Sequence, residues 1–122
     1  METMGMKPII WIASTKSDLI SLPKDIQDEI GYALYQAQLG GKSDHAKPLK
    51  GFGGASILEV VERDSGGTYR AVYTVKFKEA IAVLHVFQKK SKSGIATPKQ
   101  DIELIKNRFK VAEQQYKVWL LK

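Results

Sequence analysis

Two neighbouring runs rich in β-branched and aromatic residues, 69–77 and 80–87, constrain the fold of this chain more than any other feature. Only a short polar turn separates them, so we predict two antiparallel strands joined as a hairpin. Arg70 lies inside the first strand, and Lys89 and Lys90 close the second. Antiparallel pairing would bring these three cations to one edge of the sheet. The hairpin therefore indicates a site that binds phosphates.

The whole chain, 1–122, is predicted to be a single α+β domain with residues 1–6 as a loose tail. Strands are followed by helices whose apolar residues recur at spacings of three and four. We expect a mostly antiparallel four-stranded sheet with the helices packed on one face, which leaves the other face free as a working surface. The expected elements are a strand over 7–13, a helix from Pro23 to Gly40, strands over 57–63, 69–77 and 80–87, and a helix from Pro98 through Tyr116.

Two connecting segments carry further expectations. The stretch 42–54 is rich in glycine and lysine and is expected to be a loop. Thr97 is expected to cap the last helix with its hydroxyl, with Pro98 at the first helical position and Gln100 as its capping-box partner.

Charge is the one unusual feature of the composition. The 122 residues carry a net charge of +6, which favours an anionic partner such as nucleic acid. There is no cysteine, and the two histidines are forty residues apart, so we expect no metal site and no cofactor. The longest apolar run near the N-terminus, Ile9–Ala13, is too short to span a membrane. We therefore expect a cytoplasmic protein that makes no contact with a membrane.

An ordered set of short motifs resembles a known family. They are Lys47-Pro48-Leu49-Lys50-Gly51, Ile57-Leu58-Glu59-Val60, Tyr69-Arg70-Ala71-Val72-Tyr73, Leu84-His85-Val86-Phe87-Gln88-Lys89-Lys90, Thr97-Pro98, and a helix carrying Arg108. This set resembles the RelE/ParE superfamily of type II toxin–antitoxin toxins, and within it the phage-derived, HigB-like branch.

The resemblance implies an activity and partners. Such toxins are endoribonucleases that enter the ribosomal A site and cleave messenger RNA during translation, by metal-free attack of a ribose 2′-hydroxyl on the adjacent phosphate. A cognate antitoxin, usually a helix-turn-helix protein, neutralises the toxin, and operator DNA is contacted only through that antitoxin.

Five residues are candidates for the catalytic site: Glu59, Arg70, His85, Lys89 and Lys90. With the resemblance added, Arg70 is interpreted as a contact to the scissile phosphate; the alternative is a cross-strand ion pair with a glutamate. The two lysines are either phosphate clamps, one of which protonates the leaving oxygen, or solvated edge lysines. Strand alternation places only one of them on the same face as Arg70.

The proton acceptor has two candidates. Glu59 shares a strand face with Val61 and Arg63, and it is either a general base or a structural partner of Arg63 or Arg70. His85 matches the family motif and is either a proton shuttle or a satisfied core histidine, since it alternates with apolar residues.

Four further cations are predicted to bind RNA: Lys47, Lys50, Arg63 and Arg108. Where the HigB-like branch carries an arginine two positions after the glutamate, this chain has Val61, and we assign that place to Arg63. Two other functions fit less well. A ParE-like inhibitor of DNA gyrase would not need the clustered cations, and a non-enzymatic basic module that binds RNA or an acidic protein would need only the charge.

Overall fold

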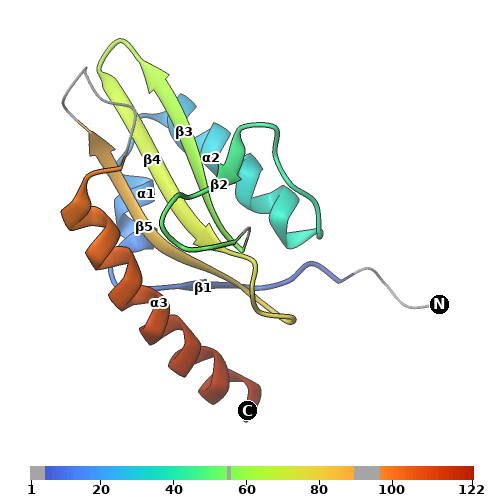
Figure 1. Ribbon diagram of the computed structural model, residues 1–122. Helices are drawn as coiled ribbons and strands as arrows, with labels where there is room; N and C mark the ends of the chain where they lie inside the picture. Colours follow the sequence, from blue (N-terminus) through green and yellow to red (C-terminus); the bar gives the residue numbers. More distant parts are fainter. Residues whose placement is uncertain (1–4, 55, 90–96) are drawn as a thin grey trace.

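The protein is described by a computed structural model, which covers residues 5–54, 56–89 and 97–122. Its strands and helices alternate irregularly along the chain (Figure 1). They are β1 (Ile9–Trp11), α1 (Thr15–Ile20), α2 (Lys24–Gln38), β2 (Ala46–Pro48), β3 (Ile57–Asp64), β4 (Gly67–Thr74), β5 (Ile81–Lys89) and α3 (Lys99–Leu120).

The described strands form one five-stranded mixed sheet in the order β1-β5-β4-β3-β2. The β3–β4 and β4–β5 hairpins are antiparallel, as predicted, whereas β1 pairs with β5 in parallel. The prediction of four strands was wrong because β2 lies within the segment 42–54 that was expected to be a loop. This strand has only three residues and ends on Pro48, whose missing N–H restricts proline to sheet edges and bulges.

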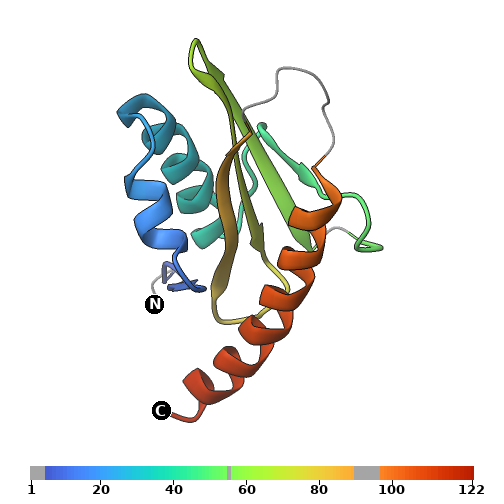
Figure 2. The same cartoon turned by 90° about the vertical axis from the view of Figure 1, so that its left-hand side faces the viewer.

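Helices cover both faces of the sheet, so the prediction of helices on one face was also wrong (Figure 2). The apolar stripe of α2 packs on the face formed by residues such as Leu58, Ala71 and Val83. Ile105 and Ala112 of α3 pack on the opposite face, against residues such as Val72 and Leu84. The sequence pattern identified both apolar stripes, but it does not say which face of a sheet a stripe will cover.

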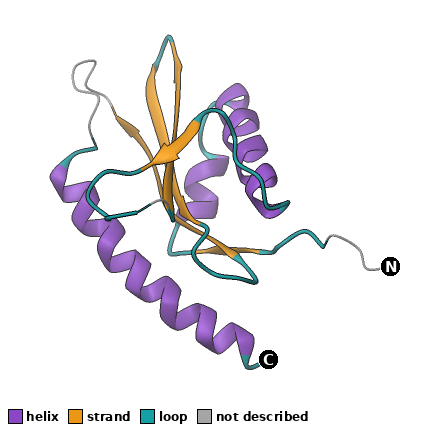
Figure 3. Ribbon diagram, turned by 45° about the vertical axis from the view of Figure 1, so that its right-hand side comes forward, coloured by secondary structure: helices purple, strands orange, loops and turns teal. Residues whose placement is uncertain are grey.

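The segment between β2 and β3 curves over the same face as α3 (Figure 3). Leu49 and Phe52 of this segment pack in the cluster that contains Ile105. The face that was expected to be free is therefore covered along much of its length. Within the described residues, no helix has both the length and the apolarity needed to cross a membrane.

The start of α3 differs from the prediction in one functional detail. Its N-cap position is held by Pro98, and no side chain caps the helix through a hydrogen bond. The hydroxyl of Thr97 instead donates to Glu59 of β3. The predicted capping box is wrong because the Thr97 hydroxyl binds the buried carboxylate of Glu59 and makes no hydrogen bond to the N-terminus of the helix.

Candidate functional site

Strand register places most of the predicted site residues in three rows across β3, β4 and β5. The rows are Arg63–Thr68–Lys89, Val61–Arg70–Phe87 and Glu59–Val72–His85. Because alternate residues of a strand face the same side, all three rows point toward the face on which α3 packs. Lys47 of β2 lies opposite Glu59 and extends the third row to the edge of the sheet.

Arg70 and Glu59 form a buried ion pair at the centre of these rows. Arg70 Nη1 donates to Glu59 Oε2 over 2.7 Å, and the two residues are only 1% and 7% exposed. Thr97 Oγ1 donates to the same carboxylate oxygen over 2.5 Å. A buried carboxylate is tolerated only when it is paired and hydrogen-bonded, and both conditions are met here. Of the two interpretations of Arg70, the structure shows the cross-strand pair.

A β-bulge in β5 decides where His85 lies. Val72 of β4 is opposite His85, but the next residue, Tyr73, is opposite Val83, so Leu84 is an extra residue in β5. The extra residue shifts the alternation of the strand. His85 was expected to share a face with Ile81, Val83 and Phe87. Phe87 does lie on the same face, but the expectation was wrong for Ile81 and Val83, because these two residues pack on the α2 face while His85 lies in the Glu59 row.

The bulge is held from α3. Arg108 Nη1 donates to the carbonyl oxygen of Leu84 over 3.0 Å, which satisfies a backbone group at the irregular point of the ladder. The same nitrogen lies 3.4 Å from His85 Nδ1. Arginine has no acceptor, so His85 Nδ1 must be unprotonated to accept from it.

His85 is enclosed on several sides. Its Nε2 donates to Asp101 Oδ1 of α3 over 2.8 Å, and its ring stacks on Phe87 with 4.2 Å between the ring centroids. Burial lowers the pKa of His85 from the ordinary 6.5, and the hydrogen bond and charge of Asp101 act against that shift. The imidazole is thus neutral at pH 7, with Asp101 fixing its tautomer.

The lowered pKa predicts a pH-dependent contribution of His85 to stability. At pH values between 6.5 and the lowered pKa of His85 in the folded protein, the unfolded state binds more protons than the folded state. The free energy of unfolding therefore decreases as the pH falls below 6.5. We expect the free energy of unfolding of His85→Gln to fall less than that of the wild type between about pH 7.5 and about pH 5.5, measured by urea denaturation.

The comparison of the wild type with His85→Gln also controls for the effect of His45. Glu62 raises the pKa of His45, which contributes a slope of the opposite sign, but His45 is present in both proteins. Equal pH slopes in the wild type and His85→Gln would contradict the prediction.

The remaining cations that were predicted as site residues lie in different parts of the structure. Lys89 shares the Arg70 face, which resolves the choice that alternation left open, whereas Lys90 lies outside the described residues. Lys47, Lys50 and Arg63 are exposed, with Lys47 and Arg63 in the rows described above and Lys50 in the segment after β2. Arg108 donates to a backbone carbonyl beside His85, and its contact with RNA stays a prediction.

Two polar residues at the start of α3 complete the arrangement, and neither was among the predicted site residues. Thr97 binds Glu59, and Asp101 binds His85, across 38 and 16 residues of sequence. Thr97 was expected to cap the helix. Asp101 lies in the first turn of α3, where an acidic residue ordinarily interacts favourably with the helix dipole. Their roles depend on α3 packing against this face of the sheet.

The arrangement combines a held carboxylate with cations on one surface. Both contacts to Glu59 described above are made to Oε2, so Oε1 is the oxygen with which this carboxylate could take a proton. Lys89 and Arg63 lie two rows away on the same face, and their charges are suited to the oxygens of a phosphodiester. The geometry suits acid–base chemistry on a polyanion.

Comparisons with known proteins agree with the sequence resemblance at the level of the family. The profile of the phage-derived protein Gp49-like family matches residues 17–110. No curated protein matches the sequence. One solved structure, the toxin–antitoxin complex RelBE2 from Mycobacterium tuberculosis, matches with 20% identity over 75% of this chain and 100% of that chain, at a TM-score of 0.47. The profile match spans most of the chain, which therefore belongs to the Gp49-like family of phage-derived proteins.

Proposed function

We propose that the protein is the toxin of a type II toxin–antitoxin system and cleaves messenger RNA in the ribosomal A site. The observation that carries this proposal is the buried Glu59–Arg70 pair, with the cations Lys89 and Arg63 on the same face of the sheet. Membership of the Gp49-like family supports it. By resemblance, the proposed toxin is of the HigB-like type.

In the proposed reaction Glu59 is the general base. Its Oε1 takes the proton of a ribose 2′-hydroxyl, whose oxygen then attacks the adjacent phosphorus. The bond from phosphorus to the 5′-oxygen breaks, and Lys89 gives a proton to that oxygen as it leaves. The products are a 2′,3′-cyclic phosphate and a 5′-hydroxyl, so proton and electron pairs balance without a metal or a second reactant.

Arg70 acts through Glu59 in this scheme. At 1% exposure its first role is to orient the carboxylate, and direct contact of either buried residue with the RNA requires movement of a covering group. Lys89 and Arg63 are better placed to bind the phosphate, and exposed Lys47 and Lys50 add sequence-independent contacts to RNA. Lys90 is a second candidate for the phosphate clamp on sequence grounds alone.

The proposed partners follow from the same function. The substrate is messenger RNA on the ribosome, in the cytoplasm, and a cognate helix-turn-helix antitoxin would neutralise the toxin and contact operator DNA. Neither a cofactor nor a membrane takes part.

Induction in bacterial cells tests the proposal. We expect growth to stop and a reporter messenger RNA to be cut within its reading frame, with mapped 5′-hydroxyl ends. The matched control is the same reporter with its start codon removed, which is expected to remain intact because it is not translated. Equal cleavage of both reporters would contradict ribosome dependence, and unaffected growth would contradict a toxin.

A further inference from the structure

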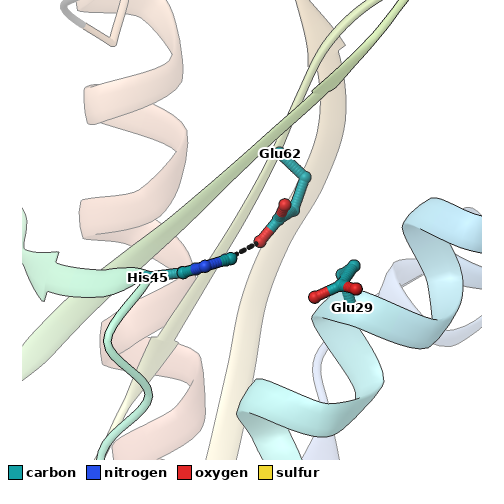
Figure 4. A group of neighbouring side chains, drawn as sticks. All are labelled: Glu29, His45 and Glu62. Atoms are coloured by element: carbon teal, nitrogen blue, oxygen red, sulfur yellow. Dashed lines mark hydrogen bonds and ion pairs between the residues drawn. The ribbon is translucent and has the colours of Figure 1, made fainter.

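Glu29, His45 and Glu62 converge on the side of the sheet that α2 covers (Figure 4). One ligand-type atom from each residue lies within 4.8 Å of the other two. The three come from separate parts of the fold: the middle of α2, the residue before β2, and β3. Glu62 pairs with Tyr69 in the ladder, so it points away from the face that carries Arg70.

The backbone positions of all three residues are fixed by regular structure or by a turn. Glu29 is in a helix of fifteen residues and Glu62 is in the long β3–β4 hairpin. His45 is held by its own backbone N–H, which donates to Ser43 Oγ over 3.0 Å, and the next residue, Ala46, donates to the Ser43 carbonyl. Side chains on fixed backbones can bind a ligand with little loss of entropy.

Charge distinguishes this cluster from an ordinary surface ion pair. His45 Nδ1 lies 2.5 Å from Glu62 Oε2, and one carboxylate would be enough for that pair. Glu29 faces the pair from α2, and the charge of Asp44 also acts on His45. Among the described residues, no lysine or arginine forms an ion pair with Glu29 or Glu62. Negative charge is therefore in excess at this point of a chain with a net charge of +6.

The donor set selects the kind of cation. Imidazole nitrogen favours zinc and its neighbours among the transition metals, whereas magnesium and calcium favour sites made only of oxygen. Zinc binds nitrogen and carboxylate oxygen at about 2.0–2.2 Å, so its ligand atoms stand roughly 3.3 Å apart in a tetrahedron. The ligand atoms of the three residues lie within 4.8 Å of one another, and Glu29 and His45 are exposed, so their side chains are free to rotate toward such a geometry.

We propose that Glu29, His45 and Glu62 form a zinc site that ties α2 to β3 and to the start of β2. Two carboxylates and a neutral imidazole would neutralise the ion and leave its fourth position to water. The site is independent of the proposed RNA cleavage, because it lies on the other face of the sheet. Sequence spacing missed it because only one of its ligands is a histidine, and the other two are sixteen and seventeen residues away from it.

Calorimetric titration of zinc chloride into tag-free protein, previously stripped with EDTA, tests the site. We expect one zinc ion per chain and an unfolding temperature that rises with zinc concentration, because an ion that binds only the folded state stabilises it. Loss of an outer-shell partner ordinarily weakens metal binding by about 10- to 100-fold, so His45→Ala and Glu29→Gln should each weaken it by at least about tenfold.

Asp28→Asn is the matched control. Asp28 is the neighbour of Glu29 on α2, is exposed, and pairs only with Lys24 among the described residues, so zinc binding should equal that of the wild type. Excess magnesium should not displace the zinc. Absence of saturable zinc binding by the wild type would overturn the proposal. So would unchanged affinity in the double variant Glu29→Gln/His45→Ala, provided that its zinc-free unfolding temperature matches that of the wild type.

Discussion

Replacing Arg70 with methionine is expected to lower the free energy of unfolding by about 3–5 kcal/mol. The change removes the cation that pairs with Glu59, a residue that is 7% exposed, and among the described residues it leaves only the hydroxyl of Thr97 donating to this carboxylate. The reason is the stranded charge rather than lost volume, because methionine fills much of the same space. Urea denaturation followed by circular dichroism measures the effect.

The double variant Arg70→Met/Glu59→Leu separates the stranded charge from packing. Replacing both partners of a buried ion pair with apolar residues is often neutral or stabilising, so most of the lost stability should return. A double variant that is as unstable as Arg70→Met alone would show that the pair is not the cause. Activity should be absent from both variants, because neither retains the Glu59–Arg70 pair in the proposed reaction.

The second large effect is expected on catalysis. Lys89→Ala should reduce the rate of messenger RNA cleavage by about hundredfold or more, which is the usual contribution of a positioned general acid. Lys89 is half-buried at the end of β5, so we expect its replacement to change the free energy of unfolding by less than about 1 kcal/mol. Cleavage is measured as the rate at which a translated reporter loses full-length message.

Lys24→Ala is the matched control for this variant. Lys24 is an exposed lysine at the start of α2, on the opposite side of the sheet, and it carries the same charge. The control should cut the reporter at close to the wild-type rate. If Lys24→Ala and Lys89→Ala lose activity equally, general charge rather than a specific proton donor is responsible, and the assignment of Lys89 is wrong.

Much of the local structure could be predicted because it depends on neighbours in sequence. Alternating β-branched and aromatic residues predicted the hairpin from Tyr69, and Asp64-Ser65-Gly66 predicted the turn before it. In that turn Asp64 Oδ1 accepts hydrogen bonds from the backbone N–H groups of Gly66 and Gly67. Period and turn chemistry are local properties, so a sequence can express them directly.

The site was predicted only in part because its contacts depend on register and packing. The extra residue Leu84 shifts β5 and places His85 on the face of the sheet that carries Glu59, and no pattern in 80–87 reveals it. Thr97 was assigned to a cap because capping is a local rule, yet it binds a carboxylate 38 residues away. Asp101 became a partner of His85 only because α3 lies on that face.

By itself, the sequence determined the α+β class, the hairpin, both apolar helix stripes and the family resemblance. These follow from periodicity, composition and the order of motifs. Only the tertiary structure decided that α3 covers the face of Glu59 and Arg70, and that these two residues are buried together. Burial is the physical reason. Water would screen the two charges at the surface, whereas in the interior each charge requires the other as its partner. Whether a residue is buried depends on how the whole chain packs.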